Sequence, residues 1–278
     1  MKSKPVTWHL GVATSHTRVE AWESDFNQHW NARYYHRSFQ LASERVATLC
    51  GQENPGTGSI IHRVVRFHRE LFIGTAVEVR SVRIDGGALD GSVVHILSGD
   101  GTVSATALDH TRYPCQVLPA VDAEELSWAM PRSSHEVDMV WDPVAPDAVV
   151  SETGSVRREE LDHQGILLME HIIRRAGIAV HRQLARLGFT AEFTRATSVS
   201  RMAVELAVTP LEACQPGVPL IIKSRITRIR EKSFSSIHLL ETLDGRPAAK
   251  TVDSLVTVDL KTRRAVTVPE FIRSLSLE

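Results

Sequence analysis

Residues 23–34 read Glu-Ser-Asp-Phe-Asn-Gln-His-Trp-Asn-Ala-Arg-Tyr, and this stretch decides the fold because the chain repeats it. Residues 160–171 read Glu-Leu-Asp-His-Gln-Gly-Ile-Leu-Leu-Met-Glu-His, at an offset of 137 positions. Around these stretches, 19–51 and 156–188 share seven identities, where average residue usage gives about two. The identical pairs are Val19/Val156, Glu23/Glu160, Asp25/Asp162, Arg37/Arg174, Ala42/Ala179, Arg45/Arg182 and Gly51/Gly188.

More matches follow in the same order at slightly larger offsets. Residues 92–97 align with 235–240, which places His95 beside His238, and Asp109 then aligns with Asp253. The offset is close to half of the 278 residues, so the sequence predicts two copies of one unit. We expect an N-terminal repeat at 1–114, a linker at 115–154 and a C-terminal repeat at 155–278.

Each copy contains one long helical pattern after a short extended segment, expected at 17–22 and 155–159. The first helix has a single apolar stripe that ends at Gly51, and the second spans 168–187 and ends at Gly188. The stripe of the first helix consists of Tyr35, Phe39, Ala42, Val46 and Leu49.

Four β-like stretches follow the helix in each copy. Hairpin turns are predicted at Asp85-Gly86-Gly87, Asp100-Gly101 and Asp244-Gly245. The sequence therefore predicts an α+β fold in which each unit wraps an antiparallel sheet around one helix. The expected strands are 59–69, 76–85, 89–97 and 102–112, and then 197–208, 218–230, 234–243 and 248–260.

The linker contains several prolines and no repeat match. Asp122 is expected to cap a short helix over 123–128 within it.

Composition narrows the classes of partner and compartment. Lys plus Arg number 32 and Asp plus Glu 33, so no global field favours nucleic acid or an anionic membrane. No stretch is apolar enough for a membrane span or a signal peptide. The cysteines, Cys50, Cys115 and Cys214, form no CxxC pair and are interpreted as thiols, so a cytoplasmic location is expected.

The segment from 23 to 34 resembles the entry motif D-x-D-x-x-G-H-V-N-N-x-x-Y of the hotdog-fold acyl-CoA thioesterases of the 4-hydroxybenzoyl-CoA thioesterase type. Asp25, His29, Asn31 and Tyr34 match the motif, whereas Glu23 replaces its first Asp and Gln28 its Gly. The spacing of Asp25, Asn27 and His29 is also similar to that of the tandem-hotdog acyl-carrier-protein thioesterases of plants.

The resemblance implies two fused hotdog units that hydrolyse an acyl thioester. Asp25 is then the nucleophile or general base, and His29 and Asn27 orient the carboxylate, the thioester or water. Amides at the start of the helix, from Trp30 to Ala32, would stabilise the oxyanion. Asn31 and Tyr34 would line the acyl pocket or support the loop. No cofactor and no metal is expected, and the partner is an acyl-CoA or acyl-carrier-protein thioester.

The second copy keeps Asp162 but has Ile166 where the first has His29 and Leu168 where it has Asn31. An apolar helix entry cannot make the polar contacts of the first. We therefore expect one competent site at Asp25, walls from the second unit, and a structural or degenerate Asp162. The fusion is expected to join the units face to face, and two such chains could still form a homodimer.

Basic strands are candidates for binding the phosphates of coenzyme A, with Arg66 as the residue assigned to this role and Arg63 beside it. A solvated strand face explains the same charges. His95 and His238 occupy equivalent places in the repeats, which favours a scaffold role. Two other functions stay open: an enoyl-CoA hydratase or dehydratase on the same fold, and a non-catalytic acyl-binding protein. The acyl chain cannot be predicted.

Overall fold

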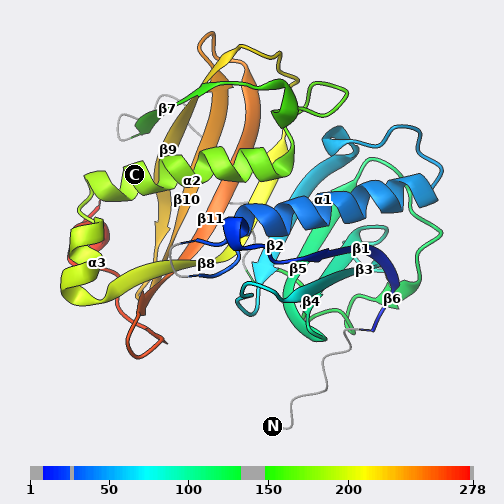
Figure 1. Ribbon diagram of the computed structural model, residues 1–278, viewed down its shortest axis with the longest axis horizontal. Coiled ribbons are helices and arrows are strands. Elements are labelled where there is room, and N and C mark those ends of the chain that lie inside the picture. Colours follow the sequence, from blue (N-terminus) through cyan, green and yellow to red (C-terminus); the bar gives the residue numbers. More distant parts are fainter. Residues whose placement is uncertain (1–8, 26–27, 133–147, 276–278) are drawn as a thin grey trace.

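The computed structural model describes residues 9–25, 28–132 and 148–275. Two units of helix and sheet stand side by side, with the first in blue to green and the second in green to red (Figure 1). The predicted α+β fold of two hotdog units is confirmed. The helices are α1 (Ala32–Leu49), α2 (Met169–Arg186), α3 (Ala191–Thr197) and α4 (Glu270–Arg273).

All strands belong to one continuous sheet. Its main path runs β1-β3-β4-β5-β2-β8-β11-β10-β9-β7, while β6 pairs with β3 and β12 with β11. The strands of the first unit are β1 (Val12–Arg18), β2 (Ile60–Phe67), β3 (Ala76–Asp85), β4 (Val93–Gly99), β5 (Thr102–Thr111) and β6 (Ala120–Asp122). Those of the second are β7 (Val149–Ser155), β8 (Val199–Pro210), β9 (Pro219–Ile229), β10 (Ser233–Thr242), β11 (Pro247–Asp259) and β12 (Arg264–Ala265).

The units join edge to edge through β2 and β8. Arg63 to Arg66 pair with Val208 to Glu205 in antiparallel register, so the sheet crosses the junction without a break. The expectation of a face-to-face fusion is therefore wrong, because each unit offers an open strand edge whose backbone groups need partners.

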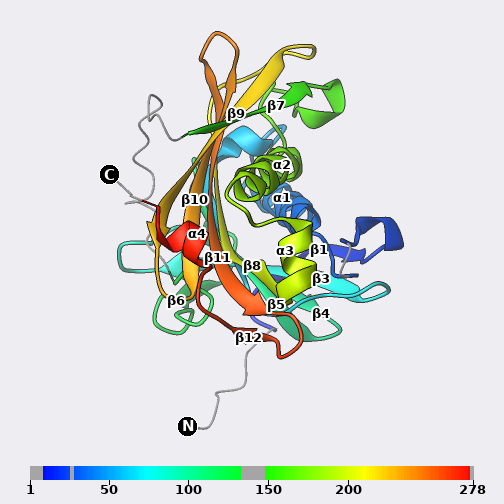
Figure 2. The same cartoon turned by 90° about the vertical axis from the view of Figure 1, so that its left-hand side faces the viewer.

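Both long helices cover the same concave face of the sheet (Figure 2). They begin and end at equivalent residues, and a left-handed glycine follows each, Gly51 with φ 80° and Gly188 with φ 107°. Tyr35, Phe39 and Ala42 of the α1 stripe pack on alternate residues of β2, β3, β4 and β5, whereas Leu49 at the end of the stripe is exposed. The opening strands lie at 12–18 and 149–155, earlier than expected. The expected segments at 17–22 and 155–159 instead contain most of the 3-10 turns Ala21–Glu23 and Arg158–Glu160.

The first part of the linker packs on the outer face of the N-terminal unit. Leu126 and Ala129 are buried against Ile84, Val94 and Ile96, the residues of β3 and β4 that point away from α1. The expected short helix is a series of turns, in which Asp122 accepts a bond from the amide of Glu124 at 2.7 Å.

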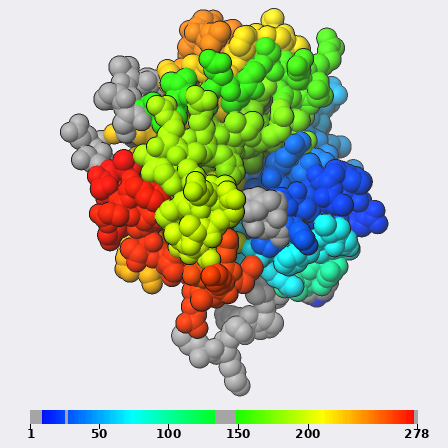
Figure 3. Space-filling view, turned by 60° about the vertical axis from the view of Figure 1, so that its left-hand side comes forward, coloured from blue at the N-terminus to red at the C-terminus, as the bar shows by residue number. Residues whose placement is uncertain are grey.

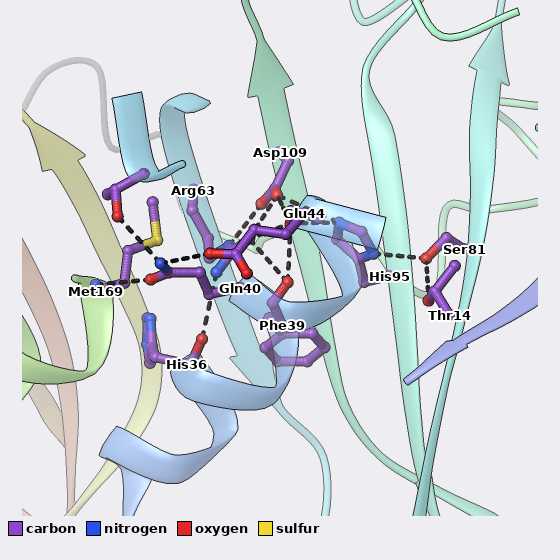
Figure 4. A network of polar contacts seen from close by, with 12 residues as sticks. Thr14, His36, Phe39, Gln40, Glu44, Arg63, Ser81, His95, Asp109 and Met169 are labelled. Atoms are coloured by element: carbon purple, nitrogen blue, oxygen red, sulfur yellow. Dashed lines mark hydrogen bonds and ion pairs between the residues drawn. The ribbon is translucent and has the colours of Figure 1, made fainter. Parts of the chain in front are cut away.

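A buried ionic network links α1 to the sheet of the first unit (Figure 4). Arg63 and Asp109 are both fully buried, and they form two bonds of 2.7 and 2.6 Å. His95 lies between Ser81, at 2.7 Å from Nδ1, and Asp109, at 3.2 Å from Nε2. His238 has the same neighbours in the second unit, Ser224 at 2.8 Å and Asp253 at 3.5 Å.

The duplicated histidines are therefore core residues, in agreement with a scaffold role. Arg63 cannot receive a phosphate, because it is completely enclosed and neutralised by Asp109.

Cys50 and Cys115 form a disulfide, with Cα atoms 5.5 Å apart, and only Cys214 is a free thiol. The interpretation of all three as thiols is therefore wrong, because residues 65 positions apart meet where α1 ends beside the segment after β5. Within the described ranges, no helix has the length and apolar character needed to span a bilayer.

Candidate active site

Asp25 closes the loop between the turn at Ala21–Glu23 and the start of α1. Its amide donates to the carbonyl of His29 at 2.8 Å, and its Oδ1 accepts the amide of His29 at 3.1 Å. The residue is half-buried. One carboxylate oxygen therefore holds the loop in place, at the mouth of the helix, as expected for an aspartate near a helix start. Asn27 lies outside the described residues.

Asp162 makes the same loop in the second unit and also contacts the first unit. Its Oδ1 accepts the amides of Gln164 and Ile166, both at 2.9 Å. Its Oδ2 accepts the amide of Thr57 from the first unit at 2.8 Å. Three backbone amides donate to this carboxylate, which is the arrangement expected of a structural aspartate.

His29 pairs with a carboxylate that the sequence analysis did not identify. Its Nδ1 lies 3.2 Å from Oε1 of Glu70, which follows β2, and its ring meets the edge of Phe72 at 5.2 Å. Arg263, between β11 and β12 of the second unit, pairs with the same glutamate. An isolated Glu at a strand end has no sequence signature, so only the fold could find it.

The hydroxyl of Tyr35 is buried in this region. Burial, and to a smaller extent the charges of Glu70 and Asp25, raise the pKa of Tyr35. The hydroxyl therefore stays protonated near neutral pH.

The start of α1 leaves one amide for a ligand. Trp30 N–H donates to Leu71 at 2.8 Å, and Asn31 N–H donates to Glu23 at 2.9 Å. Asn31 in turn caps the helix by accepting the amide of Arg33 at 3.0 Å. Ala32 N–H donates to no acceptor in the described part of the chain. Of the three amides predicted to bind an oxyanion, Ala32 is the one that the geometry leaves available.

The side chains predicted to contact substrate have different environments. Trp30 is only 3% exposed, and its indole N–H donates to Glu23 at 2.8 Å, so it is part of the core. Tyr34 lies at the surface between two guanidinium groups, those of Arg33 and Arg37, each 4.7 Å from the ring centre. Tyr34 and Asn31 both line a groove, and their role in an acyl pocket stays a prediction.

This groove runs between the start of α1 and the middle of α2. Figure 3 shows the side of the molecule on which the yellow-green second unit meets the blue first unit. Its volume is about 360 Å³. Asp25 and His29 are not among its lining residues, although Ser24, the neighbour of Asp25, is. The lining residues are Trp22, Glu23, Ser24, Asn31, Arg33, Tyr34, Ile173, Arg174, Gly177, Ile178 and His181.

A second cavity, of about 400 Å³, lies beside Asp162 and is bounded by His163 and the buried thiol of Cys214. Burial raises the pKa of this thiol, so it is a poor nucleophile near neutral pH.

Arg66 holds the linker against the sheet. One terminal nitrogen of its guanidinium donates to the carbonyls of Trp128 and Met130, both at 2.8 Å. Burial lowers the pKa of Arg66, and Arg132 acts in the same direction. This nitrogen is engaged on the outer face of the sheet, and the role of Arg66 in binding phosphate stays a prediction.

Known proteins share this fold. Residues 156–275 match the model of the thioesterase-like superfamily. A protein from Lactobacillus plantarum, provisionally described as an oleoyl thioesterase, aligns with a TM-score of 0.59 and 12% identity over 94% of this chain and 97% of its own. The 12:0-ACP thioesterase from Umbellularia californica aligns with a TM-score of 0.59 and 12% identity over 89% and 94%. No curated protein sequence matches the chain.

The fold is that of a tandem hotdog protein, and residues 156–275 are similar to the thioesterase-like superfamily. The matching family model covers the C-terminal unit, which is less than half of the chain. The resemblance seen in the sequence is thereby confirmed, at the level of superfamily and fold. The family match covers the unit with the apolar helix entry, so it identifies ancestry and not the position of the catalytic residues.

Proposed function

We propose that this protein hydrolyses acyl thioesters of coenzyme A at the start of α1. Asp25 acts as the nucleophile or general base, and Ala32 N–H stabilises the oxyanion. His29, held by Glu70, orients the carboxylate or the thioester. The observation that supports the proposal is the available amide of Ala32 at the positive end of an 18-residue helix, which follows the loop that Asp25 holds in place.

The chemistry follows from these positions. Attack on the thioester carbon converts its carbonyl oxygen into an oxyanion, which a preorganised amide stabilises better than it stabilises the ground state. A carboxylate can attack directly or take a proton from water. The Glu70 carboxylate fixes the orientation of the His29 ring, as acidic partners of catalytic histidines do.

The groove between α1 and α2 is the proposed entry for the thioester arm. Arg33 and Arg174 line it and supply positive charge near its mouth, and their side chains are 25% and 42% exposed. Both also pair with acidic residues, Arg33 with Glu170 and Arg174 with Glu160. Guanidinium groups of this kind suit the phosphates of coenzyme A. They replace the strand arginines that the sequence suggested for this role.

Release of free thiol from a panel of acyl-CoA and acyl-carrier-protein thioesters tests the proposal. Wild-type protein should hydrolyse at least one acyl-CoA, and Asp25→Asn should lose on the order of 10²–10⁴-fold in kcat. Asparagine retains an oxygen that can accept the amide of His29, so the loop should still form.

Asp162→Asn is the matched control and should keep most of the activity at temperatures where it is folded. Absence of thiol release from every thioester would eliminate hydrolysis. Water addition to an enoyl-CoA would point to a hydratase instead, and acyl-CoA binding without turnover to a binding protein.

A further inference from the structure

The two long helices meet in a way that places each helix start against the other helix. Equivalent residues of the two helices lie 137 positions apart in the sequence. Arg33 and Glu170 are equivalent in this sense, and they form an ion pair where the two helices meet. The N-terminal halves run side by side in opposite directions (Figures 1 and 2). The first residue of α2, Met169, contacts Gln40 of α1. By the internal repeat, the residue of α2 that corresponds to Gln40 for the first residue of α1, Ala32, is Gly177.

At the start of α2, a side chain from the first unit accepts the backbone amide of Met169. Gln40 Oε1 accepts the Met169 N–H at 2.9 Å (Figure 4). Its Nε2 donates to Thr57 at 3.1 Å and to Glu44 at 3.0 Å, which fixes the orientation of the amide group. Gln40 is only 5% exposed. A neutral carbonyl oxygen thus already occupies the place that a thioester carbonyl would need.

The residue of α2 that corresponds to Gln40 has no side chain. It is Gly177, and a Cβ added there would meet no atom within 4 Å. Gly177 instead lines the groove of about 360 Å³, together with Asn31 and Arg33 of α1. Glycine in the middle of a helix is unfavourable relative to alanine, so its presence here has a cost for which the open groove gives a reason.

We infer that Gln40 is an internal plug that closes the second helix start to thioester carbonyls, and that Gly177 keeps the first one open. The chain therefore binds one acyl thioester, although it has two helix starts. This inference rests on the proposed function, because it assigns the groove to a thioester. The pair Gln40 and Gly177 would then explain why the chain has one site. The loss of polar residues from the motif at 160–171 would be a second reason.

Transfer of the plug tests the inference. The probe is a 2-oxoalkyl-CoA, a ketone that retains the carbonyl of an acyl-CoA but cannot be hydrolysed, with calorimetric binding as the readout. Wild type should bind one equivalent per chain. Gly177→Gln should weaken binding at least about 30-fold, which corresponds to about 2 kcal/mol. Gly177→Ala adds the Cβ without the amide group. It should bind the ketone at least ten-fold more tightly than Gly177→Gln does.

The reverse change is Gln40→Gly, which should raise the stoichiometry from one to two. Thermal melting establishes which variants are folded, and Gly177→Gln remains decisive if Gln40→Gly does not fold. Two equivalents bound by wild type, or wild-type affinity in Gly177→Gln, would overturn the inference. Ketone binding that Gly177→Gln abolishes, with no thioester hydrolysed by wild type, would retain the plug and reject the hydrolase.

Discussion

His36 should make the stability of this protein depend on pH. It is fully buried in α1 below Gln40 in Figure 4, and neither ring nitrogen has a hydrogen-bond partner among the described residues. Burial lowers its pKa to about 3, and the charge of Arg63 acts in the same direction, against a smaller opposite effect of Asp109. The neutral ring is therefore the form that the fold accommodates.

The sign of the effect follows from the two states. As the pH falls below about 6.5, the unfolded chain takes up a proton on His36, whereas the folded protein does not until the pH approaches about 3. The free energy of unfolding therefore decreases as the pH falls through this window. From pH 7.5 to 4.5 the loss amounts to about 2.5 kcal/mol, at about 1.4 kcal/mol for each pH unit below 6.5.

His36→Ile isolates this contribution, because α2 has Ile173 at the equivalent position. Urea unfolding at pH 7.5 and 4.5 measures the loss of stability in both proteins. The variant should lose about 2.5 kcal/mol less than wild type between the two pH values. Burial also lowers the pKa of His68, to about 4, but this residue is present in both proteins and its effect cancels. Equal losses in wild type and variant would refute the reasoning.

Two further predictions concern the core and the site. Asp109→Asn should destabilise the protein by about 3–5 kcal/mol, because it leaves the buried charge of Arg63 unbalanced. Asp253→Asn, at the equivalent position beside His238, should cost about 1 kcal/mol in the same denaturation assay, and equal losses would contradict the account. Glu70→Gln should lower kcat on the order of 10²-fold with little change in melting temperature, and unchanged kcat would remove the glutamate from the site.

Local patterns predicted most of the fold. The bounds of both long helices were predicted to within a few residues, from the apolar stripe of α1 and from the glycines that end both helices. Asp-Gly pairs predicted the positions of the hairpin turns. The internal repeat then predicted two units. These signals are local or periodic, so a single sequence contains them.

Long-range contacts were not predictable in the same way. The pairing of β2 with β8 depends on which edges are open in the folded units, and the disulfide joins residues 65 positions apart. Sequence located Asp25 and the start of α1, but not Glu70 or Gln40. Both are ordinary polar residues in the sequence, and their significance arises only from what the fold places beside them.

A crystal structure with a bound 2-oxoalkyl-CoA tests the central claim most directly. The account predicts that the ketone oxygen lies within hydrogen-bond distance of Ala32 N–H, with the Asp25 carboxylate next to the carbonyl carbon and Gln40 still bonded to Met169. A ligand seated instead in the cavity beside Asp162, or with its carbonyl on Met169 N–H, would contradict it.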